Sequence, residues 1–565
     1  MKAVAAIFRM GWEIVVSGGK IVLSVSQGID GLLDEGRLEV LPGAELSIEA
    51  ADDVSSVQVS ISKTRSLPSK LTLGSKVALF VDSGVDIVPN GTEIPQITVK
   101  DGAKFLLDSA RARILVPIDL ALEGTALFDF DTTSGYYSRD VVVARSYTID
   151  GKQQPKGIYY AKADDSKKGI FVTQGLKSKT TQSMLAVPYL WTGAVGDGLW
   201  ATGANWEGGV APGTTSDWAC FFGDVSEVTI AGAQKAWGVI YYPTEAGSAL
   251  HLKGADASSS LTIGADSGYR SGMRCSKDSS LVFDLPTSFS GNEKIGFSGG
   301  GLFRFNAKTT GLFSNQQSSL MLDGRVELAG ETSMSYMTYS PHHNLNIYPP
   351  IDGVHIVDGA AVTVTGYIHY DQMGFMGAYG FVQDGGTVTT PYLLTTITRT
   401  DNKGKNNYTL NGGELNIATE MRLGGLLTGI WSAVSGTDKK VVPGGTFRMN
   451  GGTLTVPLIS NEGYDGFCQL FGGDVYLGAG GFTKTTTTQR QGSAARASEA
   501  PIQLGAATLH AETASWSSAA ELAISLDGDA EGAGAVGQHR IGVLIEIAAQ
   551  PLHTGGGSLH PFQIG

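Results

Sequence analysis

The stretch Phe447-Arg-Met-Asn450-Gly451-Gly452-Thr-Leu-Thr-Val456 decides the fold, because the chain repeats its pattern. A short strand-like segment is followed by a Gly-Gly pair and then by alternating apolar and polar residues. Recurrence of one such phrase is typical of chains that stack repeats, not of chains that fold around one closed core. The other copies are Phe381–Thr389, Tyr408–Ile417 and, with more variation, Gln469–Leu477.

The spacing of the glycine pairs indicates the kind of repeat. The intervals are 27 residues from Gly385 to Gly412, 39 to Gly451 and 21 to Gly472. Uneven intervals fit strands that stack with loop insertions better than propeller blades of fixed length. We therefore predict an all-β fold, a right-handed parallel β-helix (β-solenoid) with loop insertions and two or more stacked units. Because Asn and Gly tolerate left-handed conformations, we expect Gly451 to turn a corner with positive φ.

Composition supports many short strands and tight turns. Glycine accounts for 77 of 565 residues, about twice the usual share, and charged residues for only 17%. Hydrophobic residues make up 42%, enough for a large core, so the chain is not a disordered one. Strands favour β-branched residues, and turns favour residues that accept positive φ.

The pattern divides the chain into three parts. Residues 1–185 are predicted to be a β-solenoid unit, the end of a longer repeat, with strand–turn–strand segments such as Ile97–Leu107. Residues 186–483 are predicted to be a second unit with a Trp-rich opening and the Gly-Gly phrases. Residues 484–565 begin with a small, polar, linker-like stretch, and further strand rungs are expected after it.

Charge and cysteine content exclude several classes. The net charge is −13, from 41 basic and 54 acidic residues, and Lys and Arg do not cluster beyond isolated pairs such as Lys167-Lys168. Nucleic acid is therefore not an expected partner. The three cysteines are far apart, so we expect buried free thiols, with neither a zinc site nor a disulfide framework. No apolar stretch is long enough for a transmembrane segment.

Tryptophan is concentrated at the opening of the second unit. Four of the eight tryptophans lie between Trp191 and Trp218. Wide aromatic rings there can cap the open end of a β column, or they can form a platform on which sugars stack. The closely spaced glycines, which indicate tight turns between packed residues, favour the cap.

These motifs resemble a known family. The phrase aromatic-x-apolar-Asn-Gly-Gly-Thr-Leu-x-Val resembles the strand repeat associated with bacterial autotransporter passenger domains and similar secreted β-helix proteins. The opening Trp191–Phe221 resembles the start of such a unit, and the segment Gly151–Tyr159 resembles the end of one. The resemblance implies a right-handed parallel β-helix displayed outside the cell, commonly adhesive or structural. It implies no shared set of catalytic residues.

A search for chemistry finds only weak candidates. The nearest carboxylate pairs are Asp52-Asp53, Asp164-Asp165 and Asp527-Gly-Asp529, which lie in turn-like sequence and are interpreted as solvated acids. Neighbouring residues on a strand also point to opposite faces, which argues against a catalytic dyad. His342-His343, His355 and His369 follow no metal-ligand spacing. We therefore assign no catalytic, cofactor-binding or metal-binding residues and expect no cofactor.

The leading hypothesis is a non-enzymatic extracellular β-helix that acts as a surface, adhesive or matrix component. Its expected partners are glycans, other surface or matrix proteins, or further copies of itself. One alternative is a carbohydrate-active or glycan-binding β-helix, whose groove would be lined by the aromatic-rich segments 191–218, 336–348 and 367–379. A phage tailspike or fibre protein is the other alternative. Residues 1–9 hold too short an apolar run for a signal peptide, so extracellular location requires a leader upstream or another export route, and a cytoplasmic protein is the alternative.

Overall fold

A computed structural model gives the fold, and nearly all of its elements are β strands. The exception in the described part of the chain is a single 3-10 turn, Gly203–Asn205. The all-β prediction is thus confirmed. The structure describes residues 2–4, 14–16, 19–29, 38–40, 43–63, 65–82, 85–88, 94–108, 112–114, 116–131, 141–161, 171–172, 184–264, 272–290, 296–312, 320–322, 324–341, 353–371, 380–396, 406–423, 425–426, 441–442, 445–461, 467–484, 502–511, 522–524 and 545–547.

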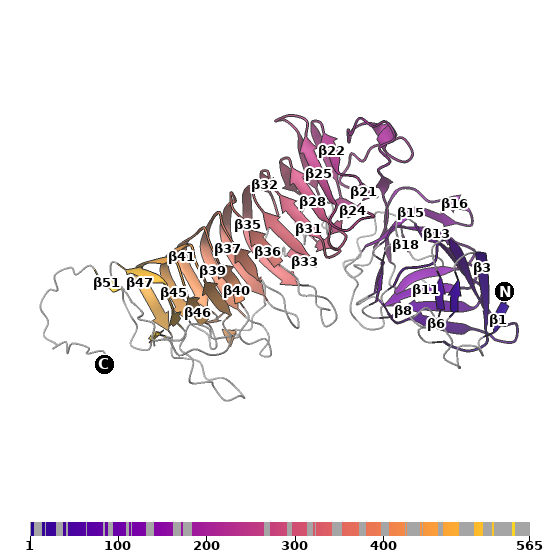
Figure 1. The fold of residues 1–565 in the computed structure, drawn as a ribbon, viewed down its shortest axis with the longest axis horizontal. Coiled ribbons are helices and arrows are strands. Elements are labelled where there is room, and N and C mark those ends of the chain that lie inside the picture. The colour runs from indigo at the N-terminus through magenta and orange to yellow at the C-terminus, as the bar shows by residue number, and fades with distance from the viewer. Residues whose placement is uncertain are drawn as a thin grey trace, which may run out of the picture.

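The first strand set forms one long sheet and three short ones (Figure 1). The long sheet has 11 strands: β1 (Lys2–Val4), β3 (Gly19–Val25), β5 (Ala44–Ala50), β7 (Lys70–Leu73), β10 (Gln96–Val99), β13 (Ile118–Leu122), β15 (Val141–Ile149), β16 (Lys152–Gln153), β17 (Gly157–Ala161), β18 (Phe171–Val172) and β19 (Met184–Val187). The short sheets contain β6 (Val57–Ile61), β8 (Val77–Val81), β11 (Lys104–Asp108) and β14 (Leu127–Asp131); β9 (Asp86–Ile87) and β12 (Arg113–Ile114); and β2 (Ile14–Val16) and β4 (Leu38–Val40).

The second strand set is built on an 18-stranded sheet. Its strands are β20 (Tyr189–Leu190), β21 (Trp218–Phe222), β23 (Ala233–Ala236), β24 (Gly238–Tyr242), β26 (Ser260–Ile263), β27 (Gly272–Cys275), β29 (Thr287–Phe289), β30 (Gly296–Ser298), β32 (Thr309–Thr310), β33 (Leu320–Leu322), β35 (Glu331–Pro341), β37 (Ala361–Asp371), β39 (Thr387–Thr396), β41 (Glu414–Leu423), β45 (Thr453–Asn461), β47 (Asp474–Lys484), β49 (Thr508–Ala511) and β51 (Ile545–Ile547).

A 12-stranded sheet accompanies it, together with one separate strand pair. The 12 strands are β22 (Glu227–Ile230), β25 (Ala249–Gly254), β28 (Ser280–Asp284), β31 (Leu302–Phe305), β34 (Arg325–Leu328), β36 (Gly353–Ile356), β38 (Phe381–Gln383), β40 (Asn406–Leu410), β44 (Thr446–Met449), β46 (Phe467–Leu470), β48 (Ile502–Leu504) and β50 (Leu522–Ile524). The pair is β42 (Gly425–Leu426) and β43 (Val441–Val442), which runs antiparallel.

The chain visits the strand rows in a fixed order, and we call one such pass a rung. The passes β25–β26–β27 and β28–β29–β30 each place three strands in succession, and each strand pairs in parallel with its counterpart one rung later. From β35 onward the second and third strands fuse into one long strand, which pairs with both β32 and β33. These long strands carry a register shift near their middle, which is typical of a bulge that bends the strand.

The core lies between the rows, because alternate residues of each strand point inward. In the second set the inward residues form one continuous hydrophobic cluster from Trp191 to Leu509. Rungs stack like on like: Phe381 pairs with Tyr408, and Tyr408 pairs with Phe447. The tail strands β48–β51 continue the same two sheets, so the strands expected after residue 484 extend the stack.

The two sets meet across a small buried cluster. Val143 and Ala186 of the first set pack there against Trp218, Trp237 and neighbouring residues of the second. The guanidinium of buried Arg274 also donates a hydrogen bond across the contact to the backbone oxygen of Ile114, at 3.2 Å. The first set ends with antiparallel strands β16, β17 and β18, and β17 pairs with β19. The segment Gly151–Tyr159, which resembles the end of a unit, therefore pairs with the last strands of the long sheet.

The glycine pairs form corners that stack on one another, but the expectation for Gly451 is wrong. Positive φ falls on the second glycine of each pair, 80° at Gly452 and 75° at Gly413, and Gly451 does not adopt it. Space instead constrains Gly451, because an added Cβ would lie 2.6 Å from the backbone oxygen of Asn411. The corner therefore needs both glycines: Gly452 because its φ is positive, and Gly451 because the neighbouring backbone leaves no room for a side chain.

These two requirements can be separated by mutation. Gly452 and Gly359 have similar φ values, 80° and 86°. An added Cβ would lie 2.6 Å from the backbone oxygen of Gly413 at Gly452, but 3.5 Å from its nearest neighbour at Gly359. We expect Gly359→Ala to cost about 1–2 kcal/mol through φ alone. Gly452→Ala should cost about 1–3 kcal/mol more, because the crowded backbone must also shift.

Urea unfolding followed by far-ultraviolet circular dichroism measures both variants. Equal losses of unfolding free energy would contradict the tight stacking of the corners.

Candidate functional site

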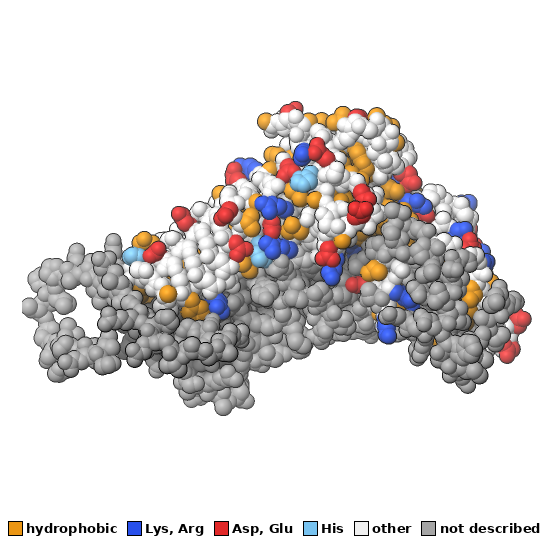
Figure 2. Space-filling model, in the orientation of Figure 1, with side chains coloured by type: hydrophobic (Ala, Val, Ile, Leu, Met, Phe, Trp, Pro, Cys, Tyr) orange, Lys and Arg blue, Asp and Glu red, His pale blue; other side chains and the backbone are white. Residues whose placement is uncertain are grey.

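A row of polar side chains follows the outward face of the 12-stranded sheet. In β31, β34 and β36 the inward residues are buried and apolar, and one polar residue stands between them on each strand. Parallel register pairs these polar residues directly, Arg304 with Glu327 and Glu327 with His355. Side chains on a strand point alternately inward and outward, so the outward polar residues Arg304, Glu327 and His355 lie one rung apart. We call this row and the polar side chains bonded to it the ladder. Figure 2 shows charged and histidine side chains gathered over this middle part of the molecule.

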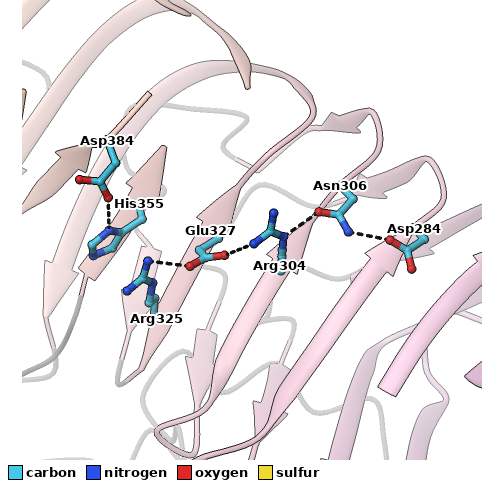
Figure 3. Close-up of polar contacts among 7 residues, drawn as sticks. All are labelled: Asp284, Arg304, Asn306, Arg325, Glu327, His355 and Asp384. Atoms are coloured by element: carbon cyan, nitrogen blue, oxygen red, sulfur yellow. Dashed lines mark hydrogen bonds and ion pairs between the residues drawn. The ribbon is translucent and has the colours of Figure 1, made fainter. Parts of the chain in front are cut away.

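Glu327 is the centre of the ladder (Figure 3). Its side chain is only 8% exposed, and it lies between two guanidinium groups. Arg304, from the preceding rung, donates to one carboxylate oxygen at 2.8 Å, and Arg325, from the same strand, contacts the other at 2.6 Å. Two charge-assisted contacts therefore offset the desolvation of this carboxylate.

The ladder continues toward the first rungs through an amide. The Arg304 Nε donates to the Oδ1 of Asn306 at 2.8 Å, and the Asn306 Nδ2 donates to the Oδ1 of Asp284 at 2.7 Å. Asp284 also lies 2.7 Å from the Nδ1 of His251. Partial burial raises the pKa of Asp284, but the hydrogen bonds from Asn306 and His251 outweigh it, so the net pKa is lowered.

The ladder also continues toward the glycine corners. The Nδ1 of His355 lies 3.1 Å from Asp384, which accepts a 2.8 Å hydrogen bond from the Nδ2 of Asn411. Asn450 donates in turn to the Oδ1 of Asn411, also at 2.8 Å. Partial burial again raises the pKa of Asp384, and the hydrogen bonds from Asn411 and His355 again more than reverse the effect.

The sequence separations show what most of these bonds do. The bonded pairs Arg304–Glu327, Asp384–Asn411 and Asn411–Asn450 are 23, 27 and 39 residues apart, which is one rung in each case. Acids and bases are present, yet their hydrogen-bonding groups are directed along the stack and do not converge on a single point. Chemically, the arrangement joins rungs and offers a polar outer surface.

The tryptophans expected to cap the second unit are buried in its core. Trp200 is fully buried and Trp206 is 2% exposed, and they pack edge to face with ring centroids 5.0 Å apart. The Trp200 indole donates to the backbone oxygen of Pro212 at 3.0 Å. The backbone of this segment bonds to Thr229 of β22, the first strand of the 12-stranded sheet. The rings are packed in the core, as the interpretation as a cap or core packing expects, and the faces of Trp200 and Trp206 are closed to sugars.

Other residues singled out from the sequence are dispersed. His355 lies on the 12-stranded sheet, whereas His369 lies in the 18-stranded sheet, where burial lowers its pKa to about 3. Tyr367 is 1% exposed, so it cannot line a groove. Asp52 and Asp53 occupy an exposed turn, as expected of solvated acids. Six positions lie outside the described residues: Asp164, Asp165, His342, His343, Asp527 and Asp529.

The cysteines are buried and free, as predicted. Burial raises the pKa of Cys220 and of Cys468 to about 12 and also raises that of Cys275. Within the described ranges, no group of three or more His, Cys, Asp or Glu side chains is arranged to hold a metal ion. No helix in those ranges is long and apolar enough to cross a membrane.

Comparison of the chain with family models, with curated proteins and with solved structures finds no match.

The sequence reasoning missed the ladder around Glu327. Arg304, Glu327 and His355 are far apart in the chain, and only the parallel register brings them together. A signal was nevertheless present, because each of the three is the one polar residue in a short apolar run. Aligning such runs one rung apart would have placed them in one row.

Removing the charge of Glu327 tests the ladder. In Glu327→Gln, two guanidinium groups lose the carboxylate that they share, so we expect the unfolding free energy to fall by about 1–3 kcal/mol. Glu331→Gln is the matched control, because Glu331 also pairs with a lysine at 2.8 Å but is 60% exposed. It should lose less than about 0.5 kcal/mol. Urea unfolding measures both, and indistinguishable losses would contradict a structural role for the ladder.

The lowered pKa values of Asp284 and Asp384 predict acid sensitivity. A carboxyl whose folded pKa lies below its unfolded value of about 3.9 stabilises the fold above that pH, and the stabilisation is lost as pH falls through the folded pKa. We expect stability to decline from about pH 5 downward, and more gently in the Asp284→Asn/Asp384→Asn variant. Thermal melting against pH measures this, with Asp53→Asn as an exposed control. Parallel curves for all three proteins would refute the assignment.

Proposed function

We propose that the chain is a right-handed parallel β-helix with loop insertions that serves outside the cell as a surface, adhesive or matrix component, without enzymatic activity. Support for the β-helix comes from strands that return rung after rung to the same parallel rows. Parallel crossovers are right-handed in almost all proteins, which supports the handedness. The proposed units are residues 1–185 and 186–483, with residues 484–565 adding a linker and further rungs.

The observation that carries the proposal is the direction of the polar contacts. Glu327, Asp384 and Asn411 each bond to a side chain one rung away. An enzyme site requires acid, base and substrate-binding groups that converge on one place. Side chains used to join rungs instead give a long, rigid surface, which suits a scaffold or an adhesin. The acidic net charge of −13 supports partners other than nucleic acid.

A carbohydrate-active enzyme is the second candidate, and one specific observation favours it. The neighbouring rungs of β31, β34 and β36 bring two arginines, a glutamate and a histidine–aspartate pair into one row (Figure 3). Positively charged and general-base groups in one row are the components that cleavage of an acidic polysaccharide needs. In this candidate His355 is the base and Arg304 and Arg325 bind the carboxylate of the sugar.

A turnover assay separates the two candidates. The purified chain is incubated with neutral and acidic polysaccharides, and the release of reducing ends and of unsaturated uronate is followed. We expect no turnover above that of a His355→Ala/Arg304→Ala variant, because a scaffold has no reacting centre. Lys253→Ala is the matched control, since Lys253 pairs with Glu227 on the same sheet, outside the row. Turnover that is lost with His355 and Arg304 but kept without Lys253 would overturn the proposal.

Location is tested separately. Antibody labelling of intact cells of the source organism should detect the chain at the surface or in the medium. Labelling that requires cell lysis would contradict the extracellular part of the proposal while leaving the fold untouched.

A further inference from the structure

The outward face of the 18-stranded sheet carries a second row of side chains, and this row is made of hydroxyl and amide groups. The pairing registers connect one outward residue from each of nine successive rungs, and none of the nine is charged. We call these residues the hydroxyl column: Thr262, Ser288, Thr310, Ser333, Thr363, Thr389, Asn416, Thr455 and Tyr476. Each is partly or fully exposed. Parallel strands lie about 4.8 Å apart, so the column is periodic.

Strand propensity alone does not explain the column. Threonine is favoured in strands, so single exposed threonines need no further reason. However, the comparable outward row on the 12-stranded sheet includes Arg304, Glu327, His355 and Arg448, together with Val282, Val382 and Thr409. The row on the 12-stranded sheet therefore holds charged residues, whereas the hydroxyl column holds none from Thr262 to Tyr476. Toward the β47 end, the surface in Figure 2 is mainly white, with few charged side chains.

The flanking charges limit what can lie on the column. Glu414 and Asp474 stand beside it on β41 and β47, two residues before Asn416 and Tyr476. Lys308, two residues before Thr310, is paired with Glu331. With a net charge of −13 on the chain, an acidic polymer would be repelled from this face. Hydroxyls both donate and accept hydrogen bonds, which matches a neutral partner that is itself rich in hydroxyls.

One end of the column adds an aromatic platform. Tyr476 is 46% exposed, and its ring stacks on His510 with centroids 4.5 Å apart and planes 9° from parallel. The Nε2 of His510 lies 3.1 Å from the Oδ1 of Asp474, which fixes the imidazole. His510 covers one face of this ring, so a sugar contacts the part of Tyr476 that stays exposed, beside the Asp474 carboxylate.

We propose that the hydroxyl column binds an extended neutral polysaccharide chain, which lies along the stack with one sugar ring over Tyr476. The periodic hydroxyls contact successive sugars, and many weak contacts act together, so no deep pocket is needed. The inference rests on the proposed function, since an adhesive or matrix protein needs a partner of this kind. It assigns that partner to the 18-stranded face and to neutral glycans.

Affinity electrophoresis of the full chain in gels containing soluble β-glucan, galactomannan or dextran tests the proposal, with polygalacturonate as the acidic comparison. We expect at least one neutral glycan to retard the chain equally at low and high salt. The Thr363→Val/Thr389→Val/Thr455→Val variant removes three hydroxyls and keeps β-branched side chains. It should raise the Kd about tenfold or more. Tyr476→Ala should also weaken binding.

Thr409→Val is the matched control, because Thr409 is an outward threonine on the other sheet. This variant should bind the glycan as the unmodified chain does. Circular dichroism and melting temperature verify that each variant is folded. Failure of every neutral glycan to bind would overturn the inference. Salt-sensitive binding to polygalacturonate alone, or a triple valine variant that binds normally, would do the same. Those results would overturn glycan binding by the hydroxyl column but not the proposed non-enzymatic surface role. Turnover of a polysaccharide, or an intracellular location, would contradict the surface role but not glycan binding by the column.

Discussion

The structure depends on backbone stacking at the glycine corners. The oxygen of Gly452 accepts a 2.9 Å hydrogen bond from the amide of Asp474, and a Cβ on Gly473 would lie 2.3 Å from the same oxygen. The strand ladder therefore continues through the corner without interruption, and only glycine leaves room for it. Because the corner fixes register, it also decides which residue of each strand faces outward. In the rungs that carry these glycine pairs, from Gly385 to Gly473, the outward rows follow from this constraint.

The two outer faces use the same register for different chemistry. On the 12-stranded sheet, the outward row holds ionised and amide groups that bond between rungs, with Glu327 between two arginines as its most buried member. On the 18-stranded sheet, the outward row holds hydroxyls that carry no charge. Charged groups joined along the stack stiffen it but leave few groups to bind a partner. This row also joins rungs where Thr262 and Ser288 hydrogen-bond at 3.0 Å, but it contains no ion pair between its own members.

Much of the fold could be predicted from the sequence, whereas little of the surface could. Strand content, the stacked glycine phrases and the buried tryptophans depend on local pattern, and the structure bears them out. The assignment of positive φ to Gly451 failed because both glycines of a pair look alike in sequence, and only stacking distinguishes Gly452. The row through Arg304, Glu327 and His355 could not be predicted because its members meet only through register. Loops of unequal length hide that register in a single sequence.

Loops of unequal length do not disturb the stacked rows. Asn411 bonds to Asp384 across 27 residues and to Asn450 across 39, and both hydrogen bonds are 2.8 Å long. The longer interval therefore leaves the length of this bond between corners unchanged. Insertion cost grows only slowly with loop length, so such a chain tolerates loops of many sizes. The stacked faces are therefore the regular surface of this protein, and a partner can contact many rungs in succession only by lying along them.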